Sequence, residues 1–196
     1  MATFAQKCVF LQEKSITRMK KFLLLTCLCA LALTACAQKE KTLVAYFSAT
    51  GTTQKVAAAL AEATGATLYE IKPEVRYTAA DLDWRDQESR SSLAMKDATC
   101  RPAIVRDLQD ADSYSTVYLG FPVWWGTAPR EINTFLESYD FSGKTVILFA
   151  TSGGSDLSQA NAEFKAGYPA LVWKDGKVLA NESSVDDLKA WVASLQ

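Results

Sequence analysis

The fold class of this chain is decided by three consecutive stretches: residues 42–47 (TLVAYF), 48–53 (SATGTT) and 54–64 (QKVAAALAEAT). The first is an apolar run without glycine or proline, and its length suits a strand that is buried on both faces. In the third, Val56 and Leu60 recur at the spacing of one helical face. A strand, a polar loop and a helix in this order predict one α/β unit.

The same alternation continues along the chain. Further strands are predicted at residues 67–71, 115–120 and 144–150, and further helices at residues 129–139, 158–165 and 185–195. Residues 172–173 and 178–179, which Asp175-Gly176 separates, indicate either a small hairpin or the last strand. Strands that alternate with helices predict a mainly parallel sheet covered on both faces.

Residues 74–102 interrupt this pattern. They are rich in charge and contain Tyr77 and Trp84. A connection of this length inside a compact domain is unusual and is often functional. We expect a short helix within residues 86–95 and a further helical turn at residues 104–108.

The first loop is a candidate phosphate site. A helix N-terminus offers unpaired backbone N–H groups and a partial positive charge, and both suit a phosphate. Serine and threonine hydroxyls surround Gly51, which permits a close backbone approach. No lysine stands where a triphosphate-binding loop requires one. The alternative interpretation is an ordinary strand-to-helix turn.

Two later loops favour a ligand. Residues 120–126 (GFPVWWG) place two tryptophans after a strand, and residues 151–155 (TSGGS) form a small polar loop rich in backbone donors. A planar aromatic ligand stacks on an indole. We expect one of Trp124 and Trp125 to face such a ligand and the other to fill space beneath its helix.

Together these loops resemble those of the flavodoxin family. Residues 48–53 are similar to the flavodoxin phosphate loop, T-x-T-G-x-T, and residues 122–129 (PVWWGTAP), 151–155 and 83–91 (DWRDQESRS) resemble a bacterial flavodoxin-like branch. The resemblance covers about residues 41–195. It implies a doubly wound, five-stranded parallel sheet of strand order 2-1-3-4-5, in which the three loops converge beyond the carboxyl ends of the strands.

The resemblance also implies bound flavin mononucleotide (FMN) and a set of cofactor-binding residues. These are Ser48, Thr50, Gly51, Thr52, Thr53, Pro122, Val123, Trp124, Trp125, Gly126, Thr151, Ser152, Gly153 and Gly154. The sequence departs from the family pattern at Ser48, which replaces a threonine, and at Asp156, where relatives often have glycine. The third loop lacks the aromatic residue that covers the second flavin face in many flavodoxins. That face is therefore open unless Tyr77 or Trp84 covers it.

The N-terminal part of the chain reads as an export signal. Met19-Lys20-Lys21 is basic, residues 22–33 are uncharged and apolar, and residues 33–36 (LTAC) resemble the lipobox of bacterial lipoproteins. The resemblance implies cleavage before Cys36, a lipid on its sulfur, and a lipoprotein anchored in a bacterial envelope, on its periplasmic or outer face. An ordinary signal peptide or an uncleaved anchor is the alternative.

Three parts of the chain follow from this interpretation. Residues 1–35 are a signal peptide, in which residues 1–18 have no role if Met19 is the true start. Residues 36–41 are a tether, and residues 42–196 are the flavodoxin-like domain.

Composition narrows the chemistry. Of the 21 basic and 22 acidic residues, removal of residues 1–35 leaves 16 and 21, a net charge of about −5, which disfavours nucleic acid as a partner. The chain has no histidine, which excludes the usual His-based nucleophile systems and zinc sites, so no metal is expected. Cys100 is the only cysteine after Cys36, and we interpret it as incidental, with a redox thiol as the alternative.

Three functions remain. The leading prediction is an FMN-dependent electron carrier, in which the flavin supplies the chemistry and the exposed ring edge meets a redox partner protein. The first alternative is an FMN-dependent NAD(P)H oxidoreductase, whose small-molecule substrate stacks on the open ring face. The second is a lipid-anchored, non-redox protein that keeps the fold and has lost the flavin. The sequence does not indicate the oligomeric state.

Overall fold

The computed structural model describes residues 41–195. The strands are β1 (Lys41–Tyr46), β2 (Thr67–Glu70), β3 (Tyr114–Pro122), β4 (Thr145–Thr151) and β5 (Val172–Val178). The helices are α2 (Thr52–Thr64), α3 (Arg90–Lys96), α4 (Arg130–Ser138), α5 (Ser158–Gly167) and α6 (Val185–Ala193), with a 3-10 turn η1 (Ala111–Ser113) before β3. The predicted signal peptide and the lipidation residue Cys36 lie outside the described residues, as does the tether up to residue 40.

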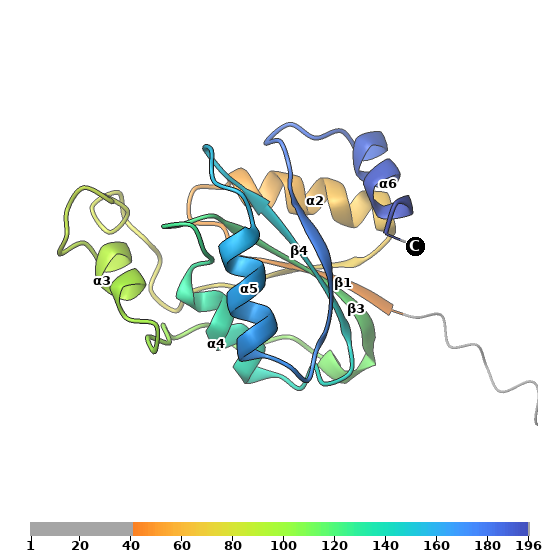
Figure 1. The fold of residues 1–196 in the computed structure, drawn as a ribbon, viewed down its shortest axis with the longest axis horizontal. Coiled ribbons are helices and arrows are strands. Elements are labelled where there is room, and N and C mark those ends of the chain that lie inside the picture. Colours follow the sequence, from red (N-terminus) through yellow and green to blue (C-terminus); the bar gives the residue numbers. More distant parts are fainter. Residues whose placement is uncertain (1–40, 196) are drawn as a thin grey trace, which may run out of the picture. The chain divides into compact units, whose positions relative to one another are not determined.

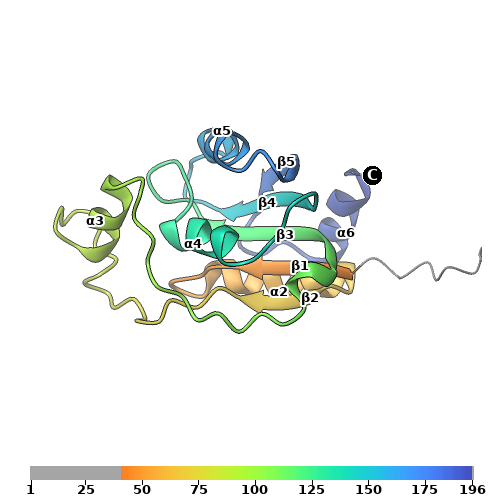
Figure 2. The ribbon, with the colours of Figure 1, turned by 90° about the horizontal axis from the view of Figure 1, so that it is seen from below.

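The strands form one parallel sheet. Its order is β2-β1-β3-β4-β5, and all four neighbouring pairs are parallel. Figure 2 shows the strands in this order, seen along the layers. The predicted fold class and strand order are therefore confirmed.

Helices cover both faces of the sheet (Figures 1 and 2). On one face, α4 and α5 bury Ile132, Phe135 and Phe164 against the alternate side chains of the central strands. On the other face, α2 and α6 bury Leu60 and Leu188 in the second core cluster. The central strands are buried on both faces, which accounts for their continuous apolar runs.

Residues 172–178 form the last strand and not a hairpin. Ile147 pairs with Lys174, and Phe149 pairs with Lys177, so two residues of β5, Asp175 and Gly176, lie opposite Leu148 alone. A β-carbon on Gly176 would lie 2.3 Å from the carbonyl oxygen of Leu148. Glycine at this bulge therefore lets the edge strand stay against β4.

The long connection between β2 and β3 extends beyond the end of the sheet and carries α3 (Figures 1 and 2). The helix predicted within residues 86–95 is present, slightly later in the chain. The helical turn predicted at residues 104–108 is wrong. There the chain is extended and pairs antiparallel with residues 72–74, because Val105 N donates to Lys72 O (2.8 Å) and Glu74 N donates to Ala103 O (3.0 Å). This pairing buries Ile104.

The close approach at Gly176 predicts a specific loss of stability. Gly176→Ala should lower the free energy of unfolding by roughly 1–3 kcal/mol, the usual cost of overpacking, because the obstacle is backbone. Urea unfolding measures this. Gly167→Ala is the matched control, since a β-carbon there meets nothing within 4 Å, and it should change stability by less than about 0.5 kcal/mol. Equal effects of the two substitutions would contradict this account of β5.

Candidate functional site

The three predicted loops meet at the carboxyl edge of the sheet. The strands β1, β3 and β4 are adjacent and parallel, so the loops that follow them lie side by side. Thr53 at the start of α2 shares a buried hydrogen bond between hydroxyls with Thr151 at the end of β4 (2.9 Å). Val123 N, just after β3, donates to Thr151 O (2.9 Å). The predicted convergence of the loops is therefore present.

The N-terminus of α2 is open. Its N-cap residue is Gly51, in the left-handed region at φ 89°, and no side chain accepts a hydrogen bond from the first turn. Gly51 N itself donates to Ser48 Oγ (3.1 Å), which shapes the loop. The hydroxyls of Thr50 and Thr52 lie 3.4 Å apart. A 13-residue helix thus presents uncapped N–H groups beside hydroxyls, as an anion site requires.

A tight turn presents the second tryptophan. Trp124 and Thr127 exchange two backbone hydrogen bonds of 2.9 and 3.0 Å, and the two residues between them have positive φ, 48° at Trp125 and 82° at Gly126. Two positive φ values are typical of a type I′ turn. A bulky residue rarely adopts such a conformation, and it is found mostly where the surroundings or a function require it. The turn leaves Trp125 48% exposed.

The first tryptophan is partly buried and packs against the core. The ring of Trp124 meets those of Phe47 and Tyr77 edge to face, at centroid distances of 5.6 and 5.5 Å. Trp124 and Trp125 therefore occupy different environments, one held by aromatic neighbours and one exposed at the tip of a turn.

Beyond these loops the surface has a hollow of about 400 Å³. It is lined by Ser48, Ala49, Thr50, Thr53, Leu82, Trp84, Ser91, Pro122, Val123, Trp124 and Trp125. The hydroxyl residues from the loop after β1 make one part of this lining polar, and the proline, valine and tryptophans make another part apolar. No titratable side chain lines the hollow in the described part of the chain.

The predicted site residues divide into two groups. Those that line the hollow are Ser48, Thr50, Thr53, Pro122, Val123, Trp124 and Trp125. Those that lie outside its lining are Gly51, Thr52, Gly126, Thr151, Ser152, Gly153 and Gly154. Gly51, Thr52, Gly126 and Thr151 shape or join the loops, as described above.

The loop after β4 folds back on itself. Ser152 Oγ accepts hydrogen bonds from Gly154 N (3.1 Å) and Ser155 N (2.8 Å). Asp156 bonds both the backbone N–H and the hydroxyl of Ser158, and the hydroxyl bond above all lowers the pKa of its carboxyl. The aspartate that departs from the family pattern thus stabilises the start of α5.

Apart from Trp84, the predicted cofactor-binding set omits three residues of the lining: Ala49, which stands inside the phosphate loop, and Leu82 and Ser91. Leu82 and Ser91 come from the connection between β2 and β3, as does Trp84, which was named with Tyr77 as one of two residues that could cover the open flavin face. Trp84 is 64% exposed, and the guanidinium of Arg85 lies 5.4 Å from its ring centroid. The only sequence signal for Ser91 was the resemblance of residues 83–91 to the flavodoxin-like branch.

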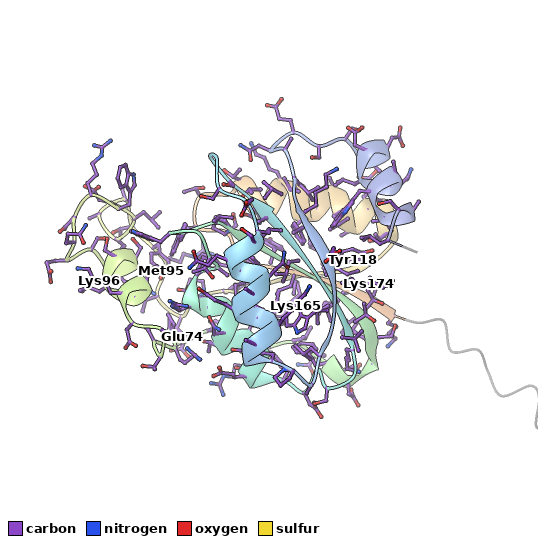
Figure 3. All side chains as sticks on the ribbon, viewed as in Figure 1. Glu74, Met95, Lys96, Tyr118, Lys165 and Lys174 are labelled. Carbon is purple, nitrogen blue, oxygen red and sulfur yellow. The ribbon has the colours of Figure 1, made fainter. Side chains whose placement is uncertain are left out.

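Side-chain bonds to α4 hold this connection in place. Tyr77 donates its hydroxyl hydrogen to Glu131 Oε1 (2.6 Å), and the Arg90 guanidinium lies 4.1 Å from the Tyr77 ring centroid. Arg101 pairs with both carboxylate oxygens of Glu137, at 2.9 Å from Nε. Figure 3 shows Met95 and Lys96 on α3, beyond the end of the sheet, and Met95 O accepts a hydrogen bond from Arg130 (3.3 Å).

Glu131 is a buried acid in this contact. Its side chain is fully buried, and Oε2 has no hydrogen-bond partner among the described residues. Burial raises the pKa of its carboxyl, although the Tyr77 hydroxyl and Arg90 act in the opposite direction. The acid lies behind Tyr77, outside the lining of the hollow, so its role is to hold the segment.

Cys100 lies in the same segment, half-buried and unpaired. Burial above all, and then Asp97, raises the pKa of its thiol. A raised pKa reduces the thiolate fraction at neutral pH, so these surroundings do not favour a reactive thiol.

Comparison with known proteins establishes the family. The sequence matches the family model described as Flavodoxin over residues 41–195. The chain therefore belongs to the flavodoxin family, as the resemblance of its loops implied. No curated protein matches the sequence. Among residues 41–195, no helix combines the length and apolar character that crossing a bilayer requires.

Solved structures agree with this assignment. A flavoprotein from Bacteroides uniformis is 53% identical, with a TM-score of 0.76, over 79% of this chain and 98% of that one. A flavoprotein from Bacteroides eggerthii is 46% identical, with a TM-score of 0.77, over 80% of this chain and 98% of that one. A flavoprotein from Lactobacillus acidophilus, solved in complex with FMN, is 25% identical, with a TM-score of 0.57, over 71% of this chain and 93% of that one.

The buried acid predicts a pH-dependent stability difference. Because the folded state raises the pKa of Glu131, its favourable contribution is present at low pH and is lost as pH rises through that pKa. Glu131→Gln keeps an oxygen for Tyr77 and never ionises. It should therefore be more stable than the wild type at pH 8, with a smaller difference at pH 4, in urea unfolding.

Glu137→Gln on the same helix is the control of opposite sign. Arg101 lowers the pKa of Glu137, so its contribution is present at pH 8 and is lost as pH falls. This variant should be less stable than the wild type at pH 8. If Glu131→Gln lost stability equally at both pH values, Glu131 would not be a buried acid of raised pKa.

Proposed function

We propose that this domain binds FMN in the hollow at the carboxyl edge of its sheet and carries electrons to or from a partner protein. The observation that supports this proposal most strongly is that one hollow joins an uncapped helix N-terminus to a wall with three indoles. FMN has the matching parts, a phosphate at one end and a planar apolar ring at the other. The FMN complex of the Lactobacillus acidophilus flavoprotein supports the same cofactor.

The phosphate fits the end of the hollow formed by residues 48–53. There the hydroxyls of Ser48, Thr50 and Thr53 line the surface, and the first turn of α2 has N–H groups that no side chain caps. Backbone donors, hydroxyls and the helix dipole bind a phosphate without a cationic side chain. No lysine or arginine lines this hollow among the described residues.

The ring fits the apolar end. Pro122, Val123 and Trp125 form one part of the wall, and Leu82 and Trp84 form another. Exposed indoles at the mouth of a hollow are suited to stacking on a planar ligand, which contributes about 0.5–1.5 kcal/mol beyond burial. When bound, the flavin supplies the redox chemistry, while the protein binds and orients it.

An electron carrier suits this lining better than an enzyme. No acid or base lines the hollow in the described part of the chain, so no side chain there is placed to move a proton for a substrate. Trp84 also lines the hollow and can cover the face of the flavin ring on which a nicotinamide would have to stack. The remaining surface of the flavin is then its edge, through which electrons pass to a protein.

The phosphate assignment predicts a loss of affinity. Thr50→Ala combined with Thr52→Ala should weaken FMN binding by roughly 1–3 kcal/mol, the value of hydrogen bonds to a charged group. Riboflavin, which has no phosphate, should bind the wild type and the double variant with equal affinity. Quenching of flavin fluorescence measures both affinities. Thr67→Ala, an exposed threonine on β2, is the control, and unchanged FMN affinity in the double variant would falsify the phosphate site.

The carrier assignment predicts slow reduction by nicotinamides. Oxidised, FMN-loaded protein mixed with NADH or NADPH without air should lose its yellow colour slowly, and quickly only when a partner reductase is added. Absorption near 450 nm follows the reaction. Fast bleaching by the nucleotide alone would make the protein an oxidoreductase. A colourless protein that takes up no FMN would instead support a non-redox function.

We also propose that the protein is exported and anchored in a bacterial envelope through Cys36. The support is the order of a basic start, an apolar run and residues 33–36 (LTAC). Several acyl chains hold a protein firmly at a membrane. Palmitate should label the wild type in the membrane fraction, and Cys36→Ser should abolish the label. Absence of label in the wild type would refute the anchor.

A further inference from the structure

Ser91 differs from the other hydroxyl residues that line the hollow in the part of the chain from which it comes. The other hydroxyl residues of the lining, Ser48, Thr50 and Thr53, come from the loop after β1 and the start of α2. Ser91 comes from α3, in the connection that also supplies Leu82 and Trp84. It is the only polar side chain of the lining that lies outside the proposed phosphate end. Ser91 is also 98% buried, so only a small part of the residue faces the hollow.

The hydroxyl of Ser91 has bonding capacity left. Its oxygen atom lies 3.5 Å from Ser89 Oγ, the far limit of a hydrogen bond. Ser89 Oγ is itself engaged, because it donates to Ser92 Oγ (2.9 Å) and accepts from Ser92 N (3.3 Å). The backbone of Ser91 is fixed by its N–H bond to Asp81 O (3.0 Å). The residue is thus held in place with a weakly occupied hydroxyl at the wall of the hollow.

Two backbone donors on the tryptophan side are already used. Val123 N donates to Thr151 O, and Trp124 N donates to Thr127 O, both at 2.9 Å. The isoalloxazine ring nevertheless has carbonyl oxygens and nitrogens along one edge, and buried polar atoms of this kind need partners. A serine hydroxyl both donates and accepts, so it can serve a ring nitrogen with or without a proton.

We propose that Ser91 hydrogen-bonds the polar edge of the flavin ring and positions the ring between the tryptophans. This inference rests on the proposed FMN function. It assigns the connection between β2 and β3 a direct part in cofactor binding, because Ser91 and Trp84 reach the ring from the same short stretch. The loop after β1 and the start of α2 hold the phosphate, while the tryptophan turn and the connection between β2 and β3 hold the ring.

The test compares Ser91→Ala with Ser92→Ala. Both serines lie on α3 and are equally buried, and Ser92 does not line the hollow. Ser91→Ala should weaken FMN and riboflavin by the same factor, about three- to tenfold, because the lost bond is to the ring and not to the phosphate. It should also shift the visible absorption maximum of the bound flavin. Ser92→Ala should lower the stability of the flavin-free protein and leave both affinities unchanged.

Three results would overturn the proposal. They are unchanged flavin affinity in Ser91→Ala, equal weakening in both variants, and weakening of FMN without weakening of riboflavin. Ser91→Cys, which fills the same space with a weaker donor, is the second variant and should change affinity in the same direction as alanine. Failure of the wild type to bind any flavin would refute the proposed function itself, which separates the two outcomes.

Discussion

Thr151 is the residue on which the geometry of the site depends. It ends β4, its hydroxyl shares a hydrogen bond with Thr53 at the start of α2, and its carbonyl accepts the N–H of Val123 after β3. One buried residue therefore joins all three loops at the edge of the sheet. These two hydrogen bonds fix the N-terminus of α2 relative to the tryptophan turn. They thereby set the distance between the polar end and the apolar end of the hollow. The parallel order of β1, β3 and β4 makes the joint possible.

The rest of the hollow is built by a segment without a sheet to hold it. Side-chain bonds to α4 hold residues 74–103 in place, and one of them joins Tyr77 to the fully buried Glu131. Burying a carboxyl with one unpartnered oxygen is unfavourable, and the raised pKa of Glu131 expresses this cost. Tyr77, which this carboxyl binds, packs edge to face against Trp124, and the same segment places Trp84 in the lining of the hollow. The unfavourable burial of Glu131 therefore accompanies the contacts that position Trp124 and Trp84 at the hollow.

Much of the fold was predictable, because regular elements have regular patterns. Continuous apolar runs such as residues 42–47 indicated strands buried on both faces, and the strand order followed from the family resemblance. The prediction of a helical turn at residues 104–108 was wrong because this segment bonds to residues 72–74. Such a pairing between residues distant in the sequence leaves no repeating pattern in the local sequence. Gly176 explains why an interrupted pattern could still be one strand, since a bulge admits two residues opposite Leu148.

The lining of the hollow was predictable in the loops after β1 and β3, as at Thr50 and Trp125. It was not predictable in the loop after β4, where Ser152 bonds its own loop and Ser152, Gly153 and Gly154 lie outside the lining. Ser91 could not be distinguished from Ser92 by residue type, and only the folded connection separates them.

The central claim is that one hollow holds a phosphate at the start of α2 and a flavin ring against the indoles. A crystal structure of the protein with FMN tests it most directly. The account predicts the phosphate within hydrogen-bond distance of residues 48–53 and the ring in contact with Trp125. Density for FMN elsewhere on the molecule, or a phosphate away from the first turn of α2, would contradict it.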